Sequence, residues 1–101
     1  MSKTSEPELG RAVMDVLATQ PNYEGTVRTL IEHVPSHITL TPEDHLPSGT
    51  RAGEEMWEQR VRNLKSHDKT PGNVIGAGLV QRVRFGTYRL TVAGRHHLGL
   101  P

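Results

Sequence analysis

Residues 51–91 read RAGEEMWEQRVRNLKSHDKTPGNVIGAGLVQRVRFGTYRLT, and this stretch decides the fold. It opens with a helix-forming run around Trp57 and continues through a connection punctuated by glycines. It ends in β-branched, aromatic and basic residues, with Gly86 at a turn position. The order predicts a basic helix followed by a basic β-hairpin. Such a helix fits the major groove of DNA, and the hairpin touches the backbone or minor groove beside it.

The helix of this stretch is predicted over residues 53–66. Trp57, Val61 and Leu64 recur at helical spacing and form its buried stripe. The opposite side carries side chains that can hydrogen-bond base edges and phosphates, although an ordinary solvated helix face is polar as well. The residues expected to face the major groove are Gln59, Arg62, Asn63 and Ser66, and those expected to hold phosphates at the helix ends are Arg51, Lys65 and Lys69.

The hairpin is predicted from strands at residues 79–84 and 87–91. Arg82, Arg84 and Arg89 are concentrated on this short ribbon. Charges on an edge strand can simply prevent aggregation, but lysine is the usual residue for that purpose. Because the planar fork of arginine suits phosphate contact, the three arginines are predicted to form the DNA contact of the hairpin.

Upstream of this stretch the sequence predicts two further helices. Ser5 is expected to cap the first, and the second is expected over residues 26–34, where Pro35 stops it. A short turn is expected at residues 41–44, and a closing helical turn, capped by Thr91, at residues 92–98. The apolar positions that recur on one face of the two helices are Leu9, Val13, Val16, Leu17, Val27, Leu30, Ile31 and Val34.

The predicted fold class is α+β. It is a winged helix-turn-helix with a three-helix core, a two-stranded β-hairpin wing and a short C-terminal helical turn. A chain of 101 residues supplies one small core, so a single domain over residues 1–101 is expected. Within it, residues 1–6 are expected to be a loose N-terminus and residues 67–78 an ordered loop before the wing.

Charge is distributed unevenly along the chain. Residues 1–50 carry three basic and seven acidic side chains, whereas residues 51–101 carry nine basic and four acidic ones. This asymmetry is typical of a protein with one face that attracts polyanions, although surface charge is often uneven for other reasons.

Composition and motif spacing argue against several other kinds of site. The chain has no cysteine, which excludes a disulfide framework and a thiolate zinc site and fits a reducing compartment. His33 and His37 have the spacing of a helical zinc pair, but Pro35 between them breaks the helix. No catalytic residue, metal or cofactor is predicted. No apolar run approaches the roughly 20 residues that cross a bilayer, so a soluble cytoplasmic protein with no membrane contact is expected.

Four segments carry a family resemblance: LPSG at residues 46–49, WEQRVRNLK at 57–65, GLV at 78–80 and GTYRLTVAG at 86–94. Together they resemble the N-terminal winged-helix domain of Mrr-like restriction endonucleases and related modules of HNH-type, modification-dependent nucleases. Those enzymes carry a separate catalytic domain, and nothing in these 101 residues supplies one, so the expected alternatives are an excised module, a stand-alone DNA-binding protein or a partner subunit. The insertion at residues 70–73 is also longer than the typical connection. The resemblance implies a DNA-reading module that directs a nuclease domain or subunit.

The sequence therefore predicts a double-stranded DNA-binding module, the target-recognition part of a restriction-type nuclease system of bacterial type. Modules of the family that the chain resembles often direct nucleases toward modified DNA, such as DNA with modified cytosine, so methylated or hydroxymethylated DNA is one expected partner; the resemblance does not say which base or modification is read. The alternative is a winged helix used as a protein-interaction or dimerisation scaffold, or as a transcriptional regulator, because a fold does not determine function.

Overall fold

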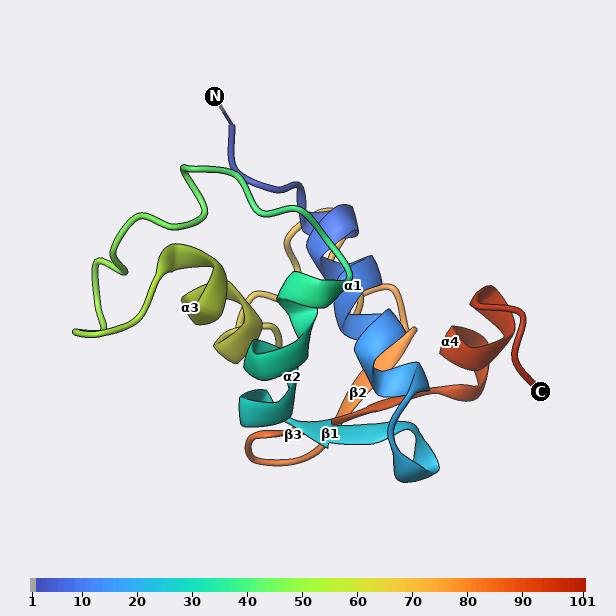
Figure 1. Ribbon diagram of the computed structural model, residues 1–101. Coiled ribbons are helices and arrows are strands. Elements are labelled where there is room, and N and C mark those ends of the chain that lie inside the picture. Colours follow the sequence, from blue (N-terminus) through green and yellow to red (C-terminus); the bar gives the residue numbers. More distant parts are fainter. Residues whose placement is uncertain (1) are drawn as a thin grey trace.

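The computed structural model describes residues 2–101 as helices packed against a small antiparallel sheet (Figure 1). The sheet order is β1-β3-β2, so the last strand in the sequence is the central one. The predicted α+β class is confirmed. The elements are α1 (Glu6–Ala18), β1 (Glu24–Thr26), α2 (Val27–His33), α3 (Met56–Arg62), β2 (Val80–Arg84), β3 (Thr87–Leu90) and α4 (Val92–His97), with short 3-10 helices at Pro21–Tyr23 and Val34–Ser36.

The first helix, α1, supplies most of the core. Ser5 caps it as predicted: its hydroxyl accepts a hydrogen bond from the Glu8 amide at 3.2 Å, and the Glu8 carboxylate accepts one from the Ser5 amide at 3.3 Å. The predicted stripe of α1 is fully buried. Thr26 caps α2 in the same way, through the Thr29 amide. Both helices are therefore specified locally by capping and by apolar spacing.

The third helix is shorter than predicted, because α3 spans Met56–Arg62 rather than residues 53–66. Its first turn is set by Glu58, whose carboxylate accepts a hydrogen bond from the Glu55 amide at 2.9 Å. Asn63 is the C-cap of α3, and in the turns that follow it the Leu64 carbonyl accepts a hydrogen bond from the side-chain amide of Asn73 at 3.1 Å. The predicted stripe of Trp57, Val61 and Leu64 is buried, but the chain after Arg62 continues as turns.

The predicted hairpin is confirmed, and a third strand joins it. Strands β2 and β3 are linked by the two-residue turn Phe85–Gly86, in which Gly86 has a φ of 74° that a residue with a Cβ rarely adopts. The strand that the sequence did not predict is β1, which pairs with β3 in the register Glu24↔Arg89. The segment Glu-Gly-Thr has no alternating apolar pattern, so only its partner makes it a strand.

The N-terminal lead-in is not loose at Thr4, and the prediction for residues 1–6 is wrong there. Thr4 is buried, and its amide donates to Asp44 Oδ1 at 2.9 Å while its hydroxyl donates to Asp44 Oδ2. The Thr41 amide adds a third bond to the same carboxylate at 2.8 Å. Burial raises the pKa of Asp44, but these hydrogen bonds together outweigh it and hold the pKa below its usual value. Asp44 therefore fastens the N-terminus to the loop before α3.

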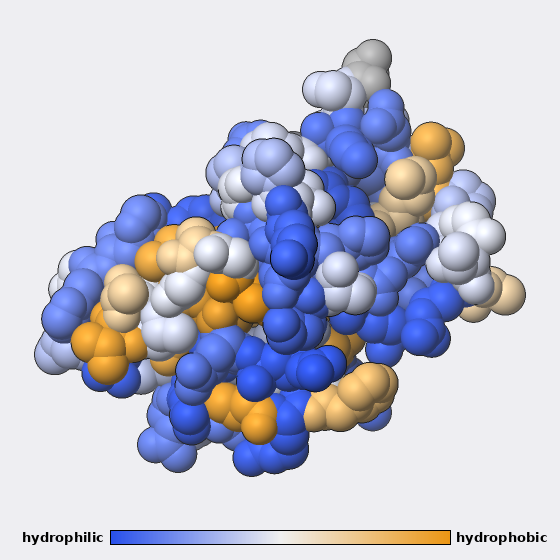
Figure 2. Space-filling view, turned by 180° about the vertical axis from the view of Figure 1, so that it is seen from behind, coloured by the Kyte–Doolittle hydropathy of each residue, from blue (hydrophilic) through white to orange (hydrophobic). Residues whose placement is uncertain are grey.

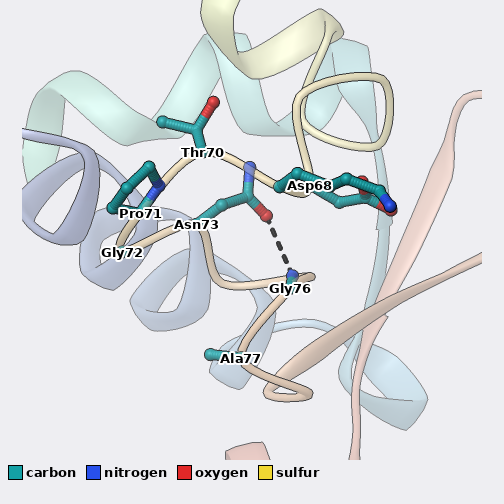
Figure 3. Close-up of a pocket in the computed structure, with 8 residues that line it drawn as sticks. Asp68, Thr70, Pro71, Gly72, Asn73, Gly76 and Ala77 are labelled. Atoms are coloured by element: carbon teal, nitrogen blue, oxygen red, sulfur yellow. Dashed lines mark hydrogen bonds between the residues drawn. The ribbon is translucent and has the colours of Figure 1, made fainter.

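Residues 67–78 are organised around the buried side chain of Asn73. Its Oδ1 accepts a hydrogen bond from the Ile75 amide at 2.8 Å. It accepts a second from the Gly76 amide at 3.1 Å, which Figure 3 shows as a dashed line. Its amide group reaches Leu64 and also donates to Glu6 Oε2 at 3.1 Å. One side chain thus connects the end of α3, the start of α1 and the approach to β2.

Candidate functional site

A groove of about 250 Å³ lies between the end of α3 and the hairpin. Four of the residues that line it are basic, and no lining residue is acidic. We call this feature the basic groove. Its lining residues are Val27, Arg51, Arg62, Asn63, Lys65, Ser66, Arg82, Phe85, Gly86 and Tyr88.

Tyr88 joins the two walls of the basic groove. It lies on β3, is 2% exposed, and its hydroxyl donates to the Arg62 carbonyl at 3.4 Å. Burial raises the pKa of Tyr88, so the phenol stays neutral and keeps its donor at physiological pH. Arg82 stands opposite Tyr88 in the strand register, which places it on the same face of the sheet. The groove is therefore built on a packed framework rather than on loops alone.

Two nearby carboxylates, those of Glu54 and Asp68, form ion pairs with cations of the basic groove. Glu54 Oε2 accepts a hydrogen bond from Arg62 Nε at 2.9 Å, and Glu54 Oε1 lies 3.9 Å from Arg51 Nε. Lys65 is paired with Asp68 at 2.8 Å. Arg82 makes no ion pair within residues 2–101. The site thus combines two arginines that share one acid, one paired lysine and one arginine without a counter-charge.

The structure brings six of the ten predicted site residues together at the basic groove. They come from the loop before α3, from the last residue of α3 and the turns that follow it, and from β2. Because α3 ends at Arg62, three of them stand on turns rather than on the predicted helix face. The six are Arg51, Arg62, Asn63, Lys65, Ser66 and Arg82.

The other four predicted residues lie elsewhere. Gln59 is held by Ser48, whose hydroxyl donates to its side-chain oxygen at 2.5 Å. Lys69 lines a separate depression together with Asn73. Arg84 and Arg89 both pair with Glu24 of β1, at 3.0 and 3.4 Å. Since β1 was not predicted, the neutralisation of these two arginines was not foreseen.

Phe85 and Val27 also line the basic groove and were not predicted. Val27 belongs to the apolar stripe of α2, so nothing in the sequence around it indicates that it also lines the groove. Phe85 did carry a signal, because a large aromatic residue in a two-residue turn has no core to enter.

In the part of the chain that the structure describes, no three histidine, aspartate or glutamate side chains gather in a way that would hold a metal ion. The zinc pair considered from the sequence is split, because α2 ends at His33 and a 3-10 turn containing Pro35 separates it from His37. No helix within residues 2–101 is long and apolar enough to span a bilayer.

No family model matches the sequence, and no curated protein or solved structure shows significant similarity to it. The resemblance to Mrr-like winged helices therefore remains a prediction, and function is argued from the site itself.

The acid behind the basic groove gives a first test of what the groove binds. Replacing Glu54 with glutamine removes the negative charge that pairs with both Arg62 and Arg51. If the groove holds a polyanion, affinity for duplex DNA at low salt should rise about three- to tenfold, because a competing interaction of about 1 kcal/mol is removed. Fluorescence anisotropy measures the change, and Asp15→Asn, which breaks the Arg11–Asp15 pair on α1, is the control. Unchanged or weaker binding of Glu54→Gln would contradict the prediction.

Proposed function

We propose that this chain is a winged helix that binds double-stranded DNA. The order of three helices followed by a hairpin, with a short strand between the first two helices that pairs with that hairpin, supports the assignment. In this proposal α3 and the turns after it approach the major groove, and β2 and β3 form the wing beside them.

The observation that carries the proposal is the lining of the basic groove, with four cations and no carboxylate. Phosphate contacts supply most of the affinity of DNA-binding proteins, and arginine suits them best. Arg51, Lys65 and Arg82 would hold phosphates. The polar side chains that would reach base edges are Arg62, Asn63 and Ser66. Gln59, Lys69, Arg84 and Arg89 are left out of this interface because they lie outside the groove.

The resemblance adds a more specific proposal, that the module reads the target of a restriction-type nuclease. This proposal is tested by measuring the affinity of the chain for methylated, hydroxymethylated and unmodified duplexes of one sequence. A preference for one modified duplex supports this role, whereas equal affinity leaves a general DNA-binding module.

Charge reversal at Arg82 tests the DNA proposal. Because Arg82 has no acidic partner in residues 2–101, Arg82→Glu frees no existing carboxylate, and it replaces a phosphate-binding cation with an anion. Affinity for duplex DNA at low salt should fall about tenfold or more, and the dependence of affinity on salt should become less steep by about one counterion. Titration at two salt concentrations measures both quantities.

The control is Arg11→Glu, which makes the same charge change on α1 and breaks only an exposed pair with Asp15. It should bind DNA with nearly the affinity of the wild type. If both variants lose affinity equally, binding follows net charge and the groove is not the interface. If the wild type binds no duplex at low salt, the alternative of a protein-interaction scaffold takes its place.

A further inference from the structure

The tip of the wing carries an aromatic ring that the fold does not use. Phe85 is 93% exposed, compared with 51% for Leu46 and 56% for Val92, the other exposed large apolar side chains in residues 2–101. Exposing a whole aromatic ring to water is unfavourable, and the ring contributes nothing to the core. The face seen in Figure 2 is hydrophilic over most of its area, with apolar groups in small separate patches. On this face, exposed apolar surface is therefore limited.

The backbone that carries Phe85 is anchored on its inner side. The Gly86 carbonyl accepts a hydrogen bond from the Val27 amide, the first residue of α2, at 3.0 Å. The residue after the turn, Thr87, pairs with Thr26 of β1. Strand β3 is thus held from both edges up to the turn itself, and the ring is presented from a fixed position rather than from a loose loop.

The surroundings of Phe85 are positively charged. The ring lies at the basic groove, together with Arg51, Arg62, Lys65 and Arg82. A ligand that satisfies both features must offer a flat apolar surface and negative charge within one small unit. A nucleotide whose base has left the stack has this combination, because the base stacks on the ring while its phosphates meet the cations. A protein partner would need a larger apolar patch than a single residue offers.

We propose that Phe85 stacks on an unstacked base, so that the chain prefers duplex DNA with a mismatched or bulged base over fully paired DNA. Apolar side chains that enter a base step must separate the bases, and this separation costs least where pairing is already disrupted. The proposal rests on the proposed DNA binding. It adds a distorted duplex as the preferred ligand and assigns the wing tip as the site that selects it.

The test compares two short duplexes of one sequence, one fully paired and one with a central mismatch. The wild type should bind the mismatched duplex about tenfold more tightly, which is within the range that stacking of one base on an aromatic ring provides. Phe85→Ala should lose this preference, because its affinity falls more for the mismatched duplex than for the paired one. Phe85→Trp should keep the preference, and the fluorescence of a base analogue at the mismatch should change on binding to the wild type or to Phe85→Trp but much less on binding to Phe85→Ala.

Val92→Ala is the matched control, since it removes another exposed apolar side chain on α4 and should leave the preference intact. Because Phe85 is exposed, all of these variants should fold, and circular dichroism verifies this. Equal binding of the two duplexes by the wild type would overturn the inference while leaving the DNA proposal standing. Binding of neither duplex at low salt would overturn both. Loss of self-association in Phe85→Ala, without a change in duplex preference, would overturn the inference in favour of a protein contact.

Discussion

Replacing Asn73 with alanine is expected to destabilise the fold by about 3–4 kcal/mol, since it leaves several buried polar groups without partners. The Ile75 and Gly76 amides lose their acceptor, and the Leu64 carbonyl loses its donor. The side chain is 2% exposed, so water does not replace these bonds fully. Urea denaturation followed by circular dichroism measures the loss in free energy of unfolding.

Thr70→Ala is the control for Asn73, because it lies in the same segment but is exposed and should change stability by no more than about 0.5 kcal/mol. An effect of Asn73→Ala as small as that would show that residues 67–78 do not depend on this side chain. Since Asn73 also holds the Leu64 carbonyl, in the turns that carry Asn63 and Lys65, the variant should loosen this wall of the basic groove. Its DNA affinity should then fall even at temperatures where it remains folded.

Replacing Asp44 with alanine is the second change with a large expected effect, about 3–5 kcal/mol at neutral pH. The carboxylate is 1% exposed and accepts hydrogen bonds from Thr4 and Thr41, and Arg60 Nη1 lies 3.8 Å away. Without it, these donors remain buried with no acceptor. The neighbouring Glu43→Ala is the control, because the Glu43 carboxylate makes no hydrogen bond or ion pair in residues 2–101.

The effect of Asp44 should depend on pH. Its pKa is lower in the folded chain than its usual value of 3.8, so the ionised carboxylate stabilises the fold fully above that value. This stabilisation is lost as pH falls through the lowered pKa of the folded state. The difference in free energy of unfolding between wild type and Asp44→Ala should therefore be largest near neutral pH and shrink below about pH 4. A difference that is independent of pH would contradict the assignment.

Local signals in the sequence predicted the helices and the hairpin well. The Ser5 and Thr26 caps, the apolar stripes and the glycine turn act within a few residues, so the sequence shows them directly. What it did not show depends on distant partners. Strand β1 exists because β3 offers an edge, and the turns after α3 are held by Asn73, which bonds to the Leu64 carbonyl from nine residues downstream.

The candidate site was predicted only in part, because it too depends on contacts between residues that are distant in the sequence. Counting charges along the chain suggested a basic half and an acidic half. In the structure, acids of the first half neutralise cations of the second: Glu24 pairs with Arg84 and Arg89, and Glu6 with Arg60 at 3.0 Å. Of the four cations that line the basic groove, Arg82 alone has no acidic partner in residues 2–101, and only the three-dimensional arrangement distinguishes it from the paired arginines.

The position of β3 at the centre of the sheet also bears on how the chain is made. Its partner strand β1 lies far upstream, and Glu24 and Arg89, which face each other across the pair, are 65 positions apart. During synthesis, β1 therefore leaves the ribosome long before its partner exists. Until β3 has been synthesised, one side of the core formed by the helices stays uncovered. Pairing two strands that are so far apart in the sequence is slow, because a long loop must close first. The arrival of the wing would complete the sheet and the proposed binding surface together, so a nascent chain would become able to bind only as it becomes fully folded.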